Sequence, residues 1–278
     1  CWLFASLNMF RYKAMEVFNV DEFEFSENYL SFWDLFEKSN LFLNNMIETA
    51  DRPIDDRKVQ HFLGSPINDG GVWNCFANLV DKYGMVPKDA MTETHSSENT
   101  RQMRSFINLK LKEDGLHLRE AVKNGIKEKA VQAMRVEMMK EIYRMLALNL
   151  GTPPAEFTWR YKDKDGNVTD YKTYTPQEFR DKVLGDIKVS EYVMLMNDPT
   201  RPYNVHYEIE NYRNTEEGSN WNYVNLPNNK IKEMAIEAIK DNEALYASCD
   251  VGKQLDRNYG ILDVNNFDYE SVYGVKFG

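Results

Sequence analysis

The feature that most constrains the fold is the order of the periodic segments, because helical patterns fill the first part of the chain and strand patterns follow. Residues 1–19 contain no glycine or proline and are apolar around most of a helix. This pattern predicts a helix that begins at or just before Cys1 and is buried on nearly all sides. Ser26 stands at the N-cap position of a second helix with an aromatic face. Helices followed by mixed strands indicate an α+β fold.

In residues 68–150, glycines mark the expected turns and helix ends. Asn68-Asp-Gly-Gly-Val-Trp73 predicts a turn, because Asp-Gly-Gly supplies residues that tolerate positive φ. The next helix should stop at Gly84. Residues 99–150 predict two or three further helices, with breaks at Gly115 and Gly125.

The pattern then changes to short strands. A hairpin around Asp165-Gly166 and a short helix at 175–183 come first. Strands are expected at 191–196, 203–212, 221–226 and 243–251, with one helix at 231–239. We therefore predict three parts: a helical lobe over 1–89, a helical insertion with a hairpin over 90–185, and the start of an incomplete β-rich lobe over 186–278.

Charge and hydropathy exclude several classes of protein. A net charge of −10 argues against a nucleic-acid partner, which would require clustered Lys and Arg. No apolar run approaches the roughly 20 residues that span a bilayer, so no membrane segment is expected. The chain opens on an apolar segment without an initiator Met, so we expect the true N-terminus, and any targeting signal, to be missing.

The three cysteines, Cys1, Cys75 and Cys249, are odd in number and lack CxxC spacing. They predict neither a disulfide framework nor a zinc site, and they fit a reducing, cytoplasmic setting. The sequence leaves open a bridge between Cys75 and Cys249, and also a signal peptide ahead of Cys1. The acidic stretch at 163–170 lacks the calcium-loop register and predicts a hairpin turn, so no metal or cofactor is expected.

Cys1 is the residue whose position most clearly suggests a catalytic role. A cysteine attacks as the thiolate, and a helix N-terminus lowers the pKa of a thiol because unpaired N–H groups favour the anion. A single cysteine at such a position is more often a small buried residue. The sequence around Cys1 makes the role of a nucleophile the better interpretation.

These neighbours resemble papain-like cysteine proteases. Cys1-Trp-Leu-Phe-Ala5, then Phe25-Ser-Glu-Asn-Tyr-Leu30, then Asn68-Asp-Gly-Gly71 follow the order of nucleophile helix, second-helix start and cleft-wall turn in that class. The chain is also similar, over nearly its whole length, to the bleomycin hydrolase and aminopeptidase C branch. The motifs that carry this similarity are Asn28-Tyr-Leu-Ser-Phe-Trp-Asp34, Lys82-Tyr-Gly-Met-Val-Pro-Lys88, Leu150-Gly-Thr-Pro-Pro154, Thr175-Pro-Gln-Glu-Phe179, Asn225-Leu-Pro227, Cys249-Asp-Val-Gly-Lys253 and Tyr269-Glu-Ser271.

The resemblance implies a papain-like fold and a cysteine aminopeptidase that acts on peptide substrates through an acyl-enzyme, without a cofactor, in a hexamer. Cys1 would be the nucleophile, and Asp69, Gly70 and Gly71 would bind substrate. In the family, an oxyanion Gln precedes the nucleophile, and a His and an Asn follow the segment matched by Tyr269-Glu-Ser271. None of the four histidines of this sequence stands in that context, so residues 1–278 alone are expected to be inactive.

Three alternatives remain open at the level of sequence. The chain could be a catalytically silent scaffold that lacks the His and Asn partners. Cys1 could be a true N-terminal nucleophile whose own α-amino group acts as the base. The glycines of the Asn68–Gly71 turn could form an ordinary connection between two helices.

Overall fold

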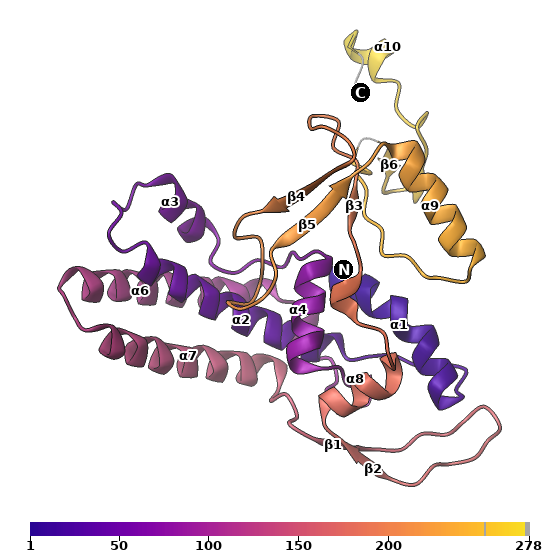
Figure 1. The fold of residues 1–278 in the computed structure, drawn as a ribbon, viewed down its shortest axis with the longest axis horizontal. Coiled ribbons are helices and arrows are strands. Elements are labelled where there is room, and N and C mark those ends of the chain that lie inside the picture. The colour runs from indigo at the N-terminus through magenta and orange to yellow at the C-terminus, as the bar shows by residue number, and fades with distance from the viewer. Residues whose placement is uncertain (253, 276–278) are drawn as a thin grey trace. The chain divides into compact units, whose positions relative to one another are not determined.

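The computed structural model describes residues 1–252 and 254–275 (Figure 1). Lys253 and residues 276–278, which fall within the predicted β-rich part, lie outside the described residues. The chain divides into two compact units, residues 1–245 and residues 246–278. The predicted division into 1–89, 90–185 and 186–278 stays a prediction.

The first two helices begin as the sequence predicts. Helix α1 spans Trp2–Phe18, with Cys1 as its N-cap and Asn19, in the left-handed conformation, as its C-cap. Helix α2 spans Glu27–Glu48, and the Ser26 hydroxyl accepts a hydrogen bond from the Tyr29 N–H at 3.1 Å. One expectation for α1 is wrong, because the helix buries one side only. Phe4 is 50% exposed and Val17 is 39% exposed, although α1 packs against α2, α4 and α8 and its Phe18 contacts Trp159 of the hairpin.

Helix α2 lies at the centre of the helical layer, and its side chains at Phe32, Leu43 and Met46 are fully buried. Two long helices, α6 (Arg101–Lys123) and α7 (Glu128–Leu150), form a hairpin that packs along α2 (Figure 1). Three shorter helices complete the layer: α3 (Arg57–Gly64), α4 (Trp73–Tyr83) and α5 (His95–Glu98).

The predicted break at Gly115 is wrong, whereas the break at Gly125 is confirmed. Helix α6 runs through Gly115 without interruption. A Cβ at this position would lie 2.7 Å from Met46 Cγ and 3.0 Å from a Phe42 ring carbon. Glycine is therefore present because α6 and α2 approach closely there. Gly125 has a φ of +71° and separates α6 from α7, as a left-handed glycine does.

The hairpin and the helix that follows it are confirmed. Strand β1 (Phe157–Trp159) pairs antiparallel with β2 (Lys172–Tyr174), and Gly166 in the connecting loop has a φ of +89°. Helix α8 (Pro176–Leu184) begins with a capping box in which the Thr175 hydroxyl accepts a hydrogen bond from the Glu178 N–H.

The strands that come later in the sequence form a sheet in the order β3-β5-β4. Strand β3 is Leu195–Met196, β4 is Val205–Ile209 and β5 is Trp221–Asn225, and helix α9 (Asn228–Lys240) follows. Two strand predictions are wrong. Only two residues of 191–196 pair with a neighbour, after a 3-10 turn at Val189–Glu191, and 243–251 forms no strand.

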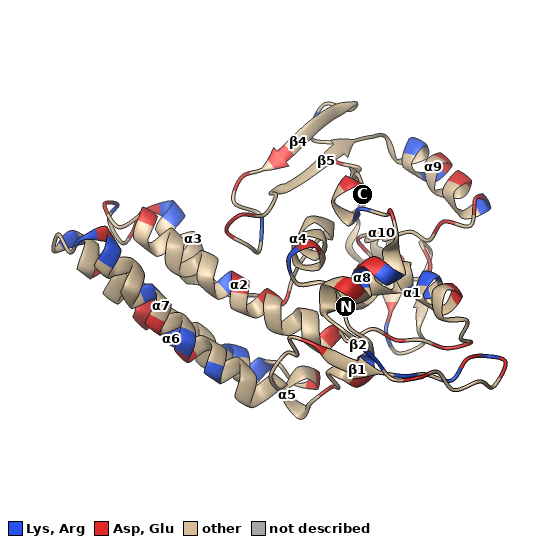
Figure 2. Cartoon of the chain, turned by 60° about the horizontal axis from the view of Figure 1, so that its bottom comes forward, with Lys and Arg blue, Asp and Glu red and all other residues tan. Residues whose placement is uncertain are grey.

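The second unit holds an antiparallel pair, β6 (Leu255–Asp256) with β7 (Ile261–Leu262), and a short helix, α10 (Tyr269–Tyr273). In the part of the chain that the structure describes, no helix combines the length and apolarity needed to cross a membrane. Figure 2 shows basic and acidic residues interspersed along α6 and α7 rather than separated by sign.

Candidate active site

Cys1 lies at the N-terminus of α1, where the first backbone N–H groups of a helix point toward solvent without partners. Its side chain is exposed and makes no capping hydrogen bond, while its carbonyl accepts the first helical bond from the Ala5 N–H at 3.0 Å. The positive end of the helix dipole favours an anion at this position. An exposed thiol at such a helix start is suited to react as a thiolate nucleophile.

The other two cysteines differ from Cys1. Cys75 is buried in α4, and burial raises the pKa of its thiol to about 11. At neutral pH this thiol stays protonated and out of reach of a substrate. Cys249 is exposed in the second unit, and all three cysteines are free. Only Cys1 therefore combines exposure with a helix N-terminus.

Trp2 connects Cys1 to the turn that the sequence analysis singled out. A Cβ at Gly71 would lie 2.7 Å from two ring carbons of Trp2, so the indole ring packs directly on the Gly71 backbone. The residue next to Cys1 thus touches the turn formed by residues 68–71. The structure thereby brings Cys1 and the predicted substrate-binding residues into one neighbourhood.

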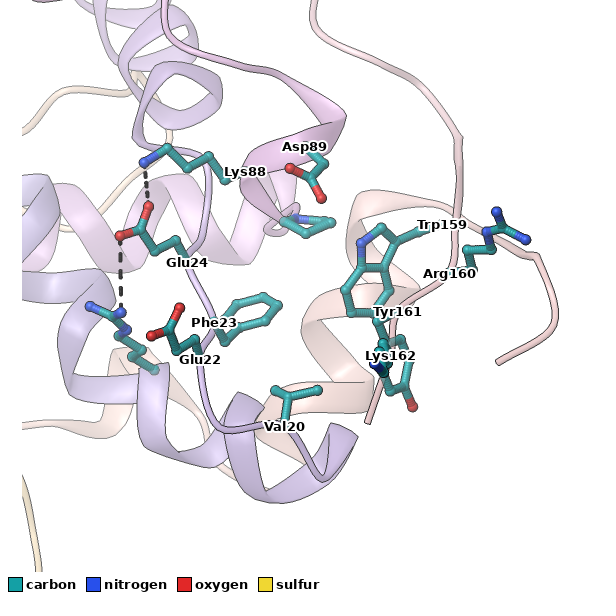
Figure 3. A pocket seen from close by; sticks show the side chains of 12 residues that line it. Val20, Glu22, Phe23, Glu24, Lys88, Asp89, Trp159, Arg160, Tyr161 and Lys162 are labelled. Carbon is teal, nitrogen blue, oxygen red and sulfur yellow. Dashed lines mark hydrogen bonds and ion pairs between the residues drawn. The ribbon is translucent and has the colours of Figure 1, made fainter. Parts of the chain in front are cut away.

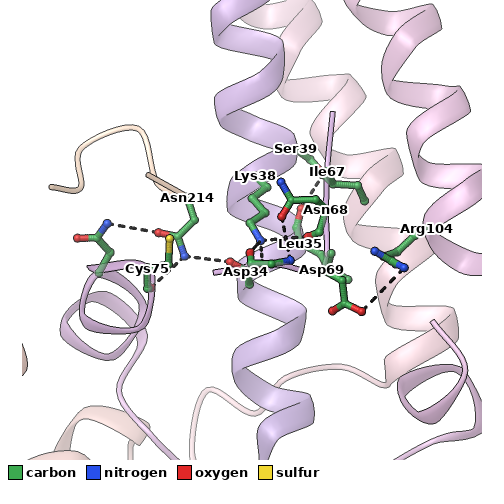
Figure 4. Close-up of polar contacts among 12 residues, drawn as sticks. Asp34, Leu35, Lys38, Ser39, Ile67, Asn68, Asp69, Cys75, Arg104 and Asn214 are labelled. Carbon is green, nitrogen blue, oxygen red and sulfur yellow. Dashed lines mark hydrogen bonds and ion pairs between the residues drawn. The ribbon is translucent and has the colours of Figure 1, made fainter. Parts of the chain in front are cut away.

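The expected reason for the two glycines is wrong. Neither Gly70 nor Gly71 has a positive φ. Gly71 is required by space, because the Trp2 ring occupies the volume of a side chain. Asp69 is exposed, and its carboxylate lies 3.9 Å from the Arg104 guanidinium of α6 (Figure 4).

Gly71 has a backbone that is free to bind. Among residues 1–252 and 254–275, no hydrogen bond uses its N–H or its C=O. The carbonyls of Asn68 and Gly70, in contrast, accept hydrogen bonds from the Lys38 ammonium at 3.1 and 2.7 Å. An unbonded N–H and C=O on one residue can pair with an extended peptide, as an added strand pairs with a sheet edge.

Lys38 belongs to a buried polar cluster that the sequence analysis did not find (Figure 4). Its Nζ lies 2.6 Å from Asp34 Oδ2, and the two side chains are 9% and 5% exposed. Asn214 donates to Asp34 Oδ1 and to the Cys75 carbonyl, each at 3.0 Å. Burial raises the pKa of the Asp34 carboxyl above its ordinary value, and Lys38 and Asn214 oppose that shift.

The sequence did contain a signal for this cluster. Asp34 and Lys38 are spaced i, i+4 within the predicted second helix, so a helix places both charges on one face, in line with Leu30 and Leu41. A charged pair in such a line is either exposed or buried with partners from elsewhere in the chain, and only the tertiary structure identifies those partners.

None of the four histidines forms a hydrogen bond or an ion pair with Cys1 among the described residues. His61 and His95 lie in the short helices α3 and α5, and His117 lies in α6. His206 lies in β4, where its Nε2 is 3.2 Å from Asn222 Oδ1. No set of three or more His, Cys, Asp or Glu side chains in residues 1–252 and 254–275 could hold a metal ion.

A pocket of about 420 Å³ lies apart from these residues, between the segment after α1 and the β1 strand (Figure 3). Its lining contains no Cys, Ser or His. Two of its cations pair with one acid, because Lys88 donates to Glu24 and Arg11 lies 3.9 Å from the same carboxylate. Neither Cys1 nor the 68–71 turn contributes to it.

Comparison with known proteins places these features in context. The model of the Peptidase C1-like family matches residues 1–278. Aminopeptidase C of Streptococcus thermophilus is 41% identical over 279 residues, and the match covers 100% of this chain and 62% of that protein. Bleomycin hydrolase of Homo sapiens is 41% identical over 282 residues, covering 99% of this chain and 62% of that protein. The chain thus spans about 62% of the length of these relatives.

A solved structure gives the same result for the fold. The crystal structure of PepW from Lactobacillus rhamnosus HN001 superposes with a TM-score of 0.94 at 38% identity, covering 100% of this chain and 63% of that one. This likeness confirms the α+β fold class.

Proposed function

The chain belongs to the Peptidase C1-like family, and on this basis we propose that the protein containing it is a cysteine aminopeptidase in which Cys1 is the nucleophile. One observation carries the proposal: the exposed Cys1 begins α1, and the adjacent Trp2 packs on Gly71, whose backbone N–H and C=O are free to bind a peptide. The names aminopeptidase C and bleomycin hydrolase among the relatives support a peptidase.

In the proposed reaction the Cys1 thiolate attacks the carbonyl carbon of the first peptide bond of the substrate. The C–N bond breaks, the leaving amine takes a proton from a general acid, and a thioester joins the acyl group to Cys1. Water then hydrolyses the thioester and restores the thiol. Gly71, with Asp69 and Gly70, would hold the substrate backbone beside Cys1 by strand-like pairing.

The resemblance supplies the remaining groups of the proposal. It assigns the general base and its orienting amide to a His and an Asn that follow Tyr269-Glu-Ser271, and the oxyanion donor to a Gln before Cys1. The observation that no described histidine contacts Cys1 favours a second candidate for residues 1–278 alone, namely a catalytically silent scaffold.

The test uses the full-length protein and an aminoacyl fluorogenic amide. Cys1→Ala should lower turnover at least about 10³-fold, because the thioester cannot form. Cys249→Ala removes the other exposed thiol and is the matched control, with turnover expected to remain at the wild-type level. Acetylating the amino group of the substrate should abolish cleavage by an aminopeptidase and would spare an endopeptidase.

Wild-type turnover that survives Cys1→Ala would refute the proposed nucleophile. The 278-residue chain by itself should give no turnover, and Cys1-dependent cleavage by that chain would show that the scaffold interpretation is wrong.

The assembly and setting of the protein are also proposals. The resemblance supports a hexamer, which light scattering of the full-length protein would test. The three free cysteines support a reducing, cytoplasmic setting, since the exposed Cys1 must stay reduced to react.

A further inference from the structure

Lys38 occupies an unusual position for a lysine, because its side chain is buried beneath the Asn68–Gly71 turn. Its ammonium has three donors, and the structure provides three acceptors: Asp34 Oδ2 at 2.6 Å, the Gly70 carbonyl at 2.7 Å and the Asn68 carbonyl at 3.1 Å. The ammonium also lies 5.6 Å from the centre of the Trp2 ring. One cation therefore touches both the turn and the residue that adjoins Cys1.

A buried ion pair of this kind is costly to form, since both charges lose their hydration. Replacing such a pair by apolar residues is often neutral or stabilising, so stability alone does not explain why it is present. The Asp34–Lys38 pair does, however, fix the position of the 68–71 turn. Asp34 fixes the ammonium, Asn214 fixes the second oxygen of Asp34, and the ammonium holds two carbonyls of the turn.

The arrangement has a direct consequence for Gly71. The carbonyls of Asn68 and Gly70 are both bound to Lys38, and the Asn68 side chain accepts a hydrogen bond from the Gly70 N–H at 2.9 Å. With the turn held from one side by Lys38 and in contact with the Trp2 ring at Gly71, the free N–H and C=O of Gly71 have a fixed location relative to Cys1.

We propose that Lys38 is a positioning residue that holds the 68–71 turn in register with Cys1, so that Gly71 can bind the backbone of a peptide substrate. Lys38 does not touch the reacting atoms. It acts through the turn and lowers the cost of ordering that backbone when substrate binds. The inference rests on the proposed function, because it assigns a role in that same site.

The test measures steady-state kinetics of the full-length protein with the aminoacyl fluorogenic amide. Lys38→Met removes the ammonium and keeps an unbranched side chain of similar length. We expect KM to rise about tenfold, in line with the loss of hydrogen bonds that order the turn. The rate of Cys1 alkylation by iodoacetamide should stay within about twofold of wild type, since this small reagent makes no use of the turn.

A second variant separates positioning from stability. Lys38→Met by itself leaves the buried Asp34 charge without its partner and could unfold the protein. Asp34→Asn combined with Lys38→Met removes both charges and keeps an oxygen that accepts from Asn214, so the fold should persist. The carbonyls of Asn68 and Gly70 still lack their donor in this double variant, so the same increase in KM is expected.

Lys110→Met is the matched control. Lys110 forms an i, i+4 ion pair with Asp114, whose side chain is 1% exposed, but it lies on α6 and touches neither the turn nor Trp2. This variant should lose stability as Lys38→Met does and keep the wild-type KM. A wild-type KM in the Asp34→Asn/Lys38→Met variant, or an equal rise in Lys110→Met, would overturn the inference.

The wild-type protein is assayed first, which keeps the two claims apart. If it shows no Cys1-dependent turnover, the proposed function fails and this inference fails with it. If turnover depends on Cys1 while KM is insensitive to Lys38, only the role of Lys38 is refuted.

Discussion

At the scale of single residues, Gly71 shows why a glycine can be required without any special backbone angle. Its φ is not in the left-handed region, yet the Trp2 ring fills the place of its side chain. The residue type follows from a contact between two segments that are far apart in the sequence.

Gly71→Ala should therefore lower the free energy of unfolding by about 1–3 kcal/mol, because the new methyl group forces the Trp2 ring to move. Urea denaturation followed by circular dichroism measures the change. Gly64→Ala is the control, since nothing lies within 4 Å of a Cβ at that helical position. That variant should be neutral or stabilising by up to about 1 kcal/mol. Equal stabilities for the two variants would contradict the steric explanation.

The candidate site could be proposed from sequence only to the extent that its motifs resemble a known family. Cys1 at a helix start and the Asp69-Gly-Gly71 turn were singled out by the order of the motifs around them, since neither a lone cysteine nor a pair of glycines is decisive by itself. Lys38 and Asp34 could not, because their role depends on acceptors at Asn68 and Gly70 that only the folded chain brings to them.

At the scale of secondary-structure elements, Gly115 is the instructive case. Glycine lowers helix propensity, and on that ground a break was expected in the middle of α6. The helix continues because α6 packs against α2 over much of its length, and the missing side chain permits that packing.

The sign of the effect of Gly115→Ala distinguishes the two explanations. Helix propensity predicts a gain of about 1 kcal/mol, whereas the contact with Phe42 and Met46 predicts a loss of about 1–3 kcal/mol. We expect the loss, measured by thermal or chemical unfolding. Pairing Gly115→Ala with Met46→Ala should cost less than the sum of the single changes, because the new methyl group fills part of the space that Met46 vacates.

The strands were harder to predict than the helices. A helix satisfies its own backbone, so the cap at Ser26 and the short helix that follows the hairpin could be located from local sequence. A strand needs a partner, and local sequence does not reveal whether one is present. Residues 243–251 have a strand-like composition but no neighbour in a sheet, and β3 extends only as far as its pairing with Val224 and Asn225.

At the scale of the whole molecule, the segment before β5 ties the sheet to the helical layer of the 1–245 unit. Asn214, which is fully buried, bonds to α2 and α4. Glu217 lies 2.5 Å from the Lys82 ammonium of α4, and Lys82 also lies 2.7 Å from the buried Glu37 of α2. Two layers that are distant in sequence are thus joined by polar contacts rather than by apolar packing alone.

This connection predicts how stability depends on pH. The hydrogen bond from Lys82 lowers the pKa of Glu217 below its ordinary value of 4.5. A lowered pKa in the folded state means that the stabilisation is fully present above pH 4.5 and is lost as the pH falls through the lower value. Glu217→Gln should therefore flatten the acid side of a plot of unfolding temperature against pH.

Glu233→Gln is the control for that experiment. It changes the net charge equally, but the pair of Glu233 with Lys230 lies within α9 and joins no two elements. If Glu217→Gln and Glu233→Gln change the dependence of unfolding temperature on pH to the same degree, the effect comes from the overall charge and not from the contact between Glu217 and Lys82.

The contact between Trp2 and Gly71 also limits how this protein can vary. We expect positions 2 and 71 to vary together, because a larger residue at 71 fits only if the ring at 2 becomes smaller. A mutant library that randomises position 71 with Trp2 intact should return mostly glycine. Joint randomisation of the two positions is the route by which an engineered variant could acquire a side chain at position 71.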